Sequence, residues 1–325
     1  MSLVQNFRGG RLPNDAARPR IRLRAPGASG QSFAPPAAVN WYAAVPAESW
    51  GMDGNDEVGD CTIAEVDHTT KATEVAAGNA EVASTTEEVL AGYSAVTGYD
   101  PADPDTDQGA EMQQVRAYWR KPGFTLGGAE HGIALFAEID GADLNLAKWA
   151  CAHFGPVGLG INCPQSALEQ FDANQDWTVV PGSPNAGGHA ISLVGYDSTW
   201  LYIVTWGRVV RMSVGFWQAY VEEAWTQLST EFVNAASGND PLGEVVRDLG
   251  QQFEALTGQP NPFPAPSPEP TPAPGPTPPG GGGDLPFLDT DPALARHVDR
   301  LVRHGRYPDR ASAVMHALRV YFREH

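Results

Sequence analysis

The sequence predicts an α+β protein in which a helical half precedes a β-rich half. Apolar residues recur at helical spacing over residues 61–78, 84–96 and 109–119. From residue 155 the pattern changes to short apolar and β-branched runs between turn residues. These runs cover 155–162, 189–196, 200–206 and 209–213. The two patterns together indicate a helical part of the chain followed by a β-rich part.

Capping signals define the ends of several expected helices. Asp60 is a candidate N-cap for the helix that opens at Cys61, and Gly78 should close that helix. Residues 84–88, Ser-Thr-Thr-Glu-Glu, have the capping-box pattern. Ser213 can cap a final helix of the β-rich part. We expect its apolar stripe to comprise Phe216, Trp217, Tyr220, Val221, Ala224 and Trp225.

Three residues far apart in the chain predict cysteine-nucleophile chemistry. Cys61 opens an amphipathic helix, Asn55 lies six positions before it, and His189 opens an apolar strand. A cysteine reacts as the thiolate, and a helix N-terminus beside an imidazolium lowers the thiol pKa. The Asn55 amide could donate to an oxyanion together with the backbone N–H of Cys61. Cys61 is therefore the expected nucleophile, His189 the base and Asn55 an oxyanion donor.

The same landmarks resemble those of the papain-like cysteine peptidases over about residues 39–230. The separation of Cys61 and His189 is also near the lower edge of the roughly 130–150 residues typical of that group. The resemblance implies a two-lobe fold, with a helical lobe and a twisted antiparallel sheet lobe, whose cleft binds an extended peptide or protein substrate. Its segments are Val39-Asn40-Trp41, Gly155-Pro156-Val157, His189 through Tyr196, and Trp206-Gly207.

The chain departs from this family at the third catalytic position. The family's histidine-orienting asparagine would fall at Val204 or, after a one-residue slip, at Thr205, which could bond the imidazole through its hydroxyl. A related group of leader-cleaving peptidases shares Asp60-Cys61 and Gly195-Tyr196-Asp197, and it too would place an acid near position 205. Thr205 is accordingly the expected orienting residue.

An inactive papain-like scaffold is the alternative interpretation. In it, Cys61 is a small buried apolar residue and His189 a structural histidine at a strand end. Asp56 and Asp60 favour this alternative, because negative charge beside a thiol disfavours the thiolate. The enzymatic interpretation requires sulfur and imidazole to meet across one groove, whereas a sulfur sealed from water would leave only a structural role.

Composition restricts the partners and the compartment. The formal net charge is −18, which argues against binding of nucleic acid by the body of the protein. The three cysteines do not suggest a disulfide framework, although a bridge between Cys151 and Cys163 stays open. The N-terminus has no signal-like apolar region, and no run approaches the ~20 apolar residues of a membrane span. We expect cytoplasmic synthesis and no membrane association.

The aspartate-rich segment 100–109 invites a calcium interpretation. Its spacing is not that of an EF-hand, and position twelve of such a loop would be Gln114 rather than glutamate. We expect a solvated turn, and neither a metal nor a cofactor.

The chain divides into four parts: a basic N-terminal arm (1–38), a papain-like domain (39–258), a Pro/Gly-rich linker (259–284) and a helical module (285–325). The arm should lie on the acidic body, with residues 20–24 as an edge strand. A helix opening at Asp240-Pro241 must bury its apolar stripe on the body or a partner. The linker should be a stiff polyproline spacer ending in a glycine hinge.

The C-terminal module resembles ribbon-helix-helix proteins through Gly305-Arg306-Tyr307 and the residues that follow. The preceding Leu285-Pro286-Phe287-Leu288 lacks the basic residues of a DNA-reading strand, so we expect dimerisation or docking on a protein partner. The overall layout also resembles proteins of bacteria and their tailed phages. That resemblance implies a virion-associated role, either as a peptidase or as an inactive decorating part.

Overall fold

The computed structural model describes residues 2–25, 34–141, 143–229 and 241–263. All of these belong to one unit of the chain, Met1–Ser267. The C-terminal module and the linker beyond residue 263 lie outside the described residues. The expectations of dimerisation, docking and ribbon-helix-helix structure therefore stay predictions.

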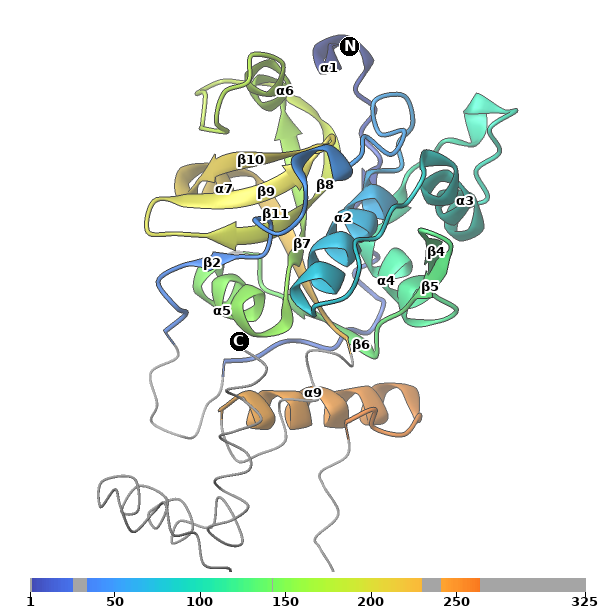
Figure 1. The fold of residues 1–325 in the computed structure, drawn as a ribbon, viewed down its shortest axis with the longest axis vertical. Coiled ribbons are helices and arrows are strands. Elements are labelled where there is room, and N and C mark those ends of the chain that lie inside the picture. Colours follow the sequence, from blue (N-terminus) through green and yellow to red (C-terminus); the bar gives the residue numbers. More distant parts are fainter. Residues whose placement is uncertain (1, 26–33, 142, 230–240, 264–325) are drawn as a thin grey trace, which may run out of the picture. The chain divides into compact units, whose positions relative to one another are not determined.

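A seven-stranded antiparallel sheet forms the β-rich lobe (Figure 1), in the order β10-β9-β8-β7-β11-β6 with β2 also paired to β8. Its helices α5, α6 and α7 pack on the sheet and supply much of the largest apolar cluster. The bounds are β2 Val39–Asn40, β6 Leu135–Ile139, α5 Leu144–Phe154, β7 Val157–Pro164, α6 Gln165–Asp172, β8 Asn185–Tyr196, β9 Trp200–Thr205, β10 Arg208–Ser213, α7 Val214–Tyr220 and β11 Val221–Leu228.

The helical lobe is built around α2, which lies against β8 of the sheet. The apolar core of this lobe is separate from that of the sheet lobe. It joins α2, α3, α4 and the small β4–β5 hairpin around Ile63, Tyr93 and Trp119. The expected capping box is confirmed, because Thr85 and Glu88 exchange side-chain and backbone hydrogen bonds at the start of α3. The bounds are η1 Ala47–Ser49, α2 Cys61–Ala76, α3 Thr86–Thr97, η2 Pro104–Thr106, α4 Met112–Arg120, β4 Phe124–Leu126 and β5 Ala129–His131.

The helix expected after Ser213 is shorter than predicted. The Ser213 hydroxyl accepts the Phe216 N–H at 3.1 Å as expected, but the helix ends at Tyr220. Residues 221–228 instead form β11, which pairs with β7 on one side and β6 on the other. The prediction of a helix through Trp225 is wrong because a short, mostly apolar run fits a buried strand as well as a helix, and pairing on both edges selects the strand.

The N-terminal arm lies on the acidic body, as expected. It contains α1 (Leu3–Asn6), which packs on α6, and β1 (Arg11–Leu12), which pairs in parallel with β3 (Ala110–Glu111). Further along, Ile21 and Leu23 exchange backbone hydrogen bonds with Glu138 at the edge of the sheet. The arm arginines pair with acids of the body: Arg8 with Asp107, Arg11 with Glu222 and Glu223, Arg18 with Glu111, and Arg20 and Arg22 with Glu138.

The helix opening at residue 241 buries its apolar stripe on the body. This helix, α9 (Pro241–Thr257), contributes Val245, Val246, Leu249 and Phe253 to the main core. Over the described residues, no helix is long and apolar enough to cross a membrane. All three cysteines are free and buried, so the bridge between Cys151 and Cys163 is not formed.

Candidate active site

The α2 N-terminus brings Cys61 against the strand that carries His189. Cys61 belongs to a small buried cluster with Met112, Ala190 and Trp225, and Ala190 directly follows His189 in β8. Helix α2 and strand β8 thus bring Cys61 beside Ala190, the residue that follows His189 in the chain. The sulfur lies at the positive end of the α2 dipole, which favours a developing thiolate.

His189 is held on two sides by the end of β9 and the turn after it. Its Nε2 lies 2.8 Å from the Thr205 hydroxyl, so the candidate orienting residue and the histidine meet. The Trp206 indole stacks on the imidazole, with ring centroids 4.4 Å apart. The other ring nitrogen, Nδ1, is buried and has no hydrogen-bond partner. It is the nitrogen left to exchange a proton with a nucleophile.

Asn55 lies in the loop that leads into α2, but both of its N–H donors are engaged. Its Nδ2 donates to the Asp60 carboxylate at 3.0 Å and to the Val58 carbonyl at 3.3 Å. Asp60 occupies the N-cap position without capping the helix, since its side chain accepts from Asn55 instead of from a first-turn N–H. An oxyanion would therefore have to compete with Asp60 for the Asn55 amide.

The N-terminal arm covers the thiol and the imidazole. Phe7 lies edge-on to His189, with ring centroids 5.5 Å apart. Gly10 lies directly against Gly59, two residues before Cys61. A Cβ added to Gly10 would lie 1.8 Å from the Gly59 carbonyl oxygen. Beneath this cover Cys61 is fully buried and His189 is 1% exposed, whereas Gly9 itself is exposed. The arm is thus one part of the cover over the thiol, which also packs against Met112, Ala190 and Trp225.

Burial keeps both groups neutral. It raises the pKa of the Cys61 thiol to about 12; backbone hydrogen bonds from Ala190 and Gly10 oppose this rise, and the neighbouring Asp60 charge adds to it. Burial also lowers the pKa of His189 to about 3, and the positive charges of His68 and Arg11 reinforce that. A thiolate–imidazolium pair is therefore strongly disfavoured while the arm is in place.

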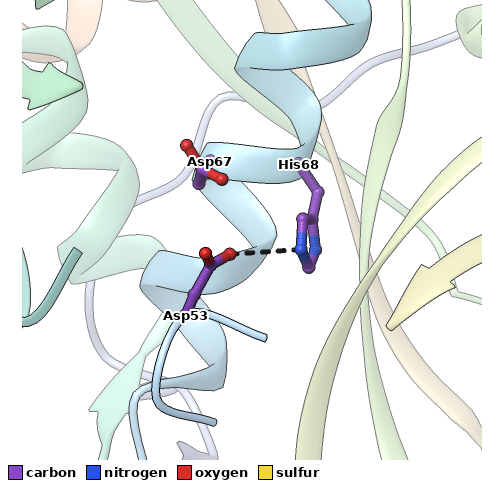
Figure 2. A group of neighbouring side chains, drawn as sticks. All are labelled: Asp53, Asp67 and His68. Carbon is purple, nitrogen blue, oxygen red and sulfur yellow. Dashed lines mark ion pairs between the residues drawn. The ribbon is translucent and has the colours of Figure 1, made fainter. Parts of the chain in front are cut away.

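Asp53, Asp67 and His68 form a buried cluster of titratable side chains (Figure 2). One atom of each lies within 4.8 Å of the others, and His68 Nε2 is 3.2 Å from Asp53. A cation is already present, because the Lys71 ammonium lies 2.6 Å from Asp67 and donates to the Trp50 carbonyl at 3.1 Å. These residues fit an internal charge network better than a metal site.

Sequence reasoning missed this network. A usable signal was the i, i+4 spacing of Asp67 and Lys71 on a helix that is buried on all sides through its first three turns. Burial raises the pKa of Asp67 to about 6. Burial alone would lower the pKa of His68, but the hydrogen bond and charge of Asp53 outweigh it and the pKa is raised.

The aspartate-rich segment contributes a structural contact near the site. Within 100–109 the carboxylates and Thr106 close a hydrogen-bonded turn around η2. Asp107 accepts from the Gly59 N–H at 3.0 Å and from the Tyr93 hydroxyl at 2.7 Å, and it pairs with Arg8 of the arm. It therefore links α3, the loop before Cys61 and the arm.

The chain is similar to several solved structures at low sequence identity. Xylellain, a cysteine protease from Xylella fastidiosa, is 14% identical with a TM-score of 0.53, over 69% of this chain and 97% of that one. The cysteine protease and lectin-like domains of Cwp84 from Clostridium difficile are 14% identical (TM-score 0.48; 69% and 56% covered). Procathepsin L 3 of Tenebrio molitor is 12% identical (TM-score 0.47; 70% and 77% covered).

The likeness to xylellain, together with the sheet and helices described above, shows that this chain has the α+β papain-like fold. No family model and no curated protein sequence matches the chain. The comparisons therefore show the fold of the chain and do not extend to a family or an activity.

Proposed function

We propose that the chain is a latent papain-like cysteine peptidase that hydrolyses peptide bonds with Cys61 and His189. The observation that carries this proposal is the arrangement of His189, whose Nε2 is bonded to Thr205 while its buried Nδ1 is left without a partner. This arrangement gives the imidazole one fixed orientation and one nitrogen available for proton transfer.

The proposed reaction uses the residues in these roles. The Cys61 proton passes to Nδ1 of His189 as sulfur attacks the substrate carbonyl, and the imidazolium then protonates the leaving amine as the C–N bond breaks. Water, activated by the same histidine, hydrolyses the thioester. The Cys61 backbone N–H and Asn55 would stabilise the oxyanion, provided that Asn55 releases Asp60. Burial raises the pKa of Asp60 well above its usual range, so a protonated Asp60 would hold the Asn55 amide less strongly.

The N-terminal arm would keep the proposed peptidase inactive. A substrate carbonyl cannot reach the sulfur while residues 7–11 lie over it, and the neutral thiol is a poor nucleophile. Displacement of the arm would readmit water, remove the burial penalty and allow the thiolate–imidazolium pair to form.

A labelling experiment tests the proposal. Gly10→Val in the full chain should displace the arm, because no side chain fits at that position. Arm release is checked by hydrogen exchange of residues 2–12, and Gly215→Ala is the control, since a Cβ there meets nothing closer than 3.9 Å. With iodoacetamide at pH 6, Cys61 of Gly10→Val should react well ahead of Cys151 and Cys163, and His189→Ala should abolish that preference. Equal, slow labelling of all three thiols in the arm-released chain would refute the enzyme.

The alternative function is an inactive papain-like module that serves as a structural part of a larger assembly. The complete burial of Cys61 favours it, since the structure holds the thiol away from water. The labelling experiment separates the two, because a scaffold would have no reactive thiol even after arm release.

We further propose that the C-terminal module docks the chain on a protein partner or dimerises it. We also propose that the protein is made in the cytoplasm and is then incorporated into a virion. The charge of −18 and the proline-rich spacer support a tethered, protein-directed role. Sedimentation of the full chain and of a chain ending at residue 263 tests dimerisation. Equal oligomeric states would refute it.

A further inference from the structure

The side chain of Arg11 fills a buried acidic pocket beside the thiol. Its Nη1 lies 2.7 Å from Glu223, and its Nη2 lies 2.5 Å from Glu222 and 3.5 Å from the Asn162 side-chain oxygen. The side chains of Arg11 and Glu223 are only 3% and 8% exposed, whereas that of Glu222, at the mouth of the pocket, is 45% exposed. The guanidinium is thus enclosed and paired with two carboxylates.

The residues around the guanidinium are fixed largely by the sheet. The Trp225 indole N–H donates to Glu223 at 2.7 Å, and the Asn162 amide donates to Glu222. Opposite them, a Cβ on Gly160 would lie 2.4 Å from Glu223 and 2.7 Å from Arg11 Cδ. The absence of a side chain at Gly160 therefore leaves the space that the arginine stem occupies.

The pocket lies next to the cluster that contains Cys61. Trp225, which orients Glu223, packs in the same cluster as Cys61. The arm places Gly10 next to the thiol and Arg11 between the two glutamates, while a Cβ on Gly188 would lie 2.1 Å from the Arg11 carbonyl oxygen. A chain bound in this way must be narrow near Cys61 and can extend a long cation into the pocket.

We propose that Glu222 and Glu223 form a subsite for an arginine side chain of the peptide substrate, which Arg11 of the arm fills until the arm is released. This inference rests on the proposed peptidase function. Once Arg11 leaves, Glu223 is a buried carboxylate without its cation, and such an uncompensated charge is costly. The planar fork of a guanidinium can pair with both carboxylates at once, whereas an ammonium is a point charge.

A binding experiment tests the subsite without requiring catalysis. The full-length Arg11→Ala variant is melted with and without N-acetyl-arginine methylamide, and in parallel with the citrulline analogue, which has nearly the same shape but no charge. The arginine compound should raise Tm and bind at least about tenfold more tightly than the citrulline compound. Arg11→Ala/Glu223→Gln should lose this effect. In the Arg18→Ala variant the arginine compound should not raise Tm, because the ion pair that this variant loses, between Arg18 and Glu111, lies at the surface. Equal effects of the two compounds, or none, would overturn the proposal.

A second measurement applies if Arg11→Ala does not fold. The full-length Gly10→Val chain is titrated with a fluorescent peptide that copies residues 6–14, and with the same peptide carrying citrulline at the position of Arg11. Tighter binding of the arginine peptide by about tenfold or more supports the subsite, and equal binding refutes it.

The subsite and the enzyme can fail separately. Arginine-specific binding without hydrolysis of any peptide would retain the subsite and remove the peptidase. Hydrolysis with no preference for arginine over citrulline would retain the peptidase and remove the subsite.

Discussion

The imidazole of His189 and the indole of Trp206 lie nearly parallel, 4.4 Å apart and inclined by 13°. Trp206 adopts a left-handed backbone conformation (φ 46°) and Gly207 follows with φ 75°, as a two-residue turn between antiparallel strands requires. Thr205 precedes this turn and bonds His189. One tight turn therefore fixes the imidazole both by stacking and by a hydrogen bond.

Thr205→Val should uncouple the imidazole from β9. The substitution keeps the shape of the side chain but leaves Nε2 of His189 without its partner, at a cost of about 1–3 kcal/mol in the free energy of unfolding. In the arm-released chain, kcat should fall about a hundredfold, because the imidazole is no longer held in one orientation. Thr205→Asn, which restores a hydrogen-bonding group, should recover much of the rate. Unchanged peptide hydrolysis by Thr205→Val would show that this contact does not orient the histidine.

Asp172 anchors the start of the arm, and its loss should loosen the cover over Cys61. It accepts from the Ser2 hydroxyl at 2.6 Å and from the N–H groups of Leu3 and Val4. We expect Asp172→Ala to accelerate alkylation of Cys61 severalfold, measured by mass spectrometry on the intact chain. Asp176→Ala removes a nearby surface pair with Arg211 and should leave the rate unchanged. Equal rates in the two variants would mean that α1 does not hold the arm over the thiol.

His189 should make the fold sensitive to acid. Its pKa is lowered to about 3 in the folded chain, against roughly 6.5 when unfolded. The unfolded state therefore takes up the proton first, so the stability that the neutral imidazole contributes is complete above about pH 6.5 and is lost as the pH falls toward 3. Asp60 and Asp67, with raised pKa values, act in the opposite direction.

The comparison with His189→Gln isolates this contribution. Between pH 7 and pH 5, the stability of the unsubstituted chain relative to the variant should fall by about 2 kcal/mol, measured by urea unfolding at each pH. A difference that does not change with pH would show that His189 is not held neutral.

Lys71 should be essential to the buried network of Figure 2. Lys71→Met removes the cation 2.6 Å from Asp67 and leaves two buried carboxylates with only His68 as counter-charge. We expect a loss of about 3–5 kcal/mol in the free energy of unfolding. A chelator should not change the Tm of the unsubstituted chain, because Lys71 already supplies the cation. A large chelator-dependent decrease in Tm would instead identify a metal site at Asp53, Asp67 and His68.

Local signals predicted most of the elements and the order of the two lobes. The capping box at Thr85 and Glu88, the cap at Ser213 and the strand that opens near His189 are set by interactions within a few residues, so they can be read from spacing alone. The strand β11 could not be distinguished in this way, because its conformation depends on pairing with β6 and β7, which lie far from it in sequence.

The same distinction between local signals and contacts of distant segments applies to the candidate site. By itself, the sequence selected the candidate residues: Cys61, His189 and Asn55 from residue type and position, and Thr205 from the family resemblance. Their catalytic roles stay proposals. Only the tertiary structure decided that Asn55 is bonded to Asp60, that Lys71 compensates a buried acidic pair, and that the arm seals the thiol with Arg11 in an acidic pocket. Such contacts join segments up to 212 residues apart, and whether they form depends on how the folded surfaces fit together, which residue spacing does not encode.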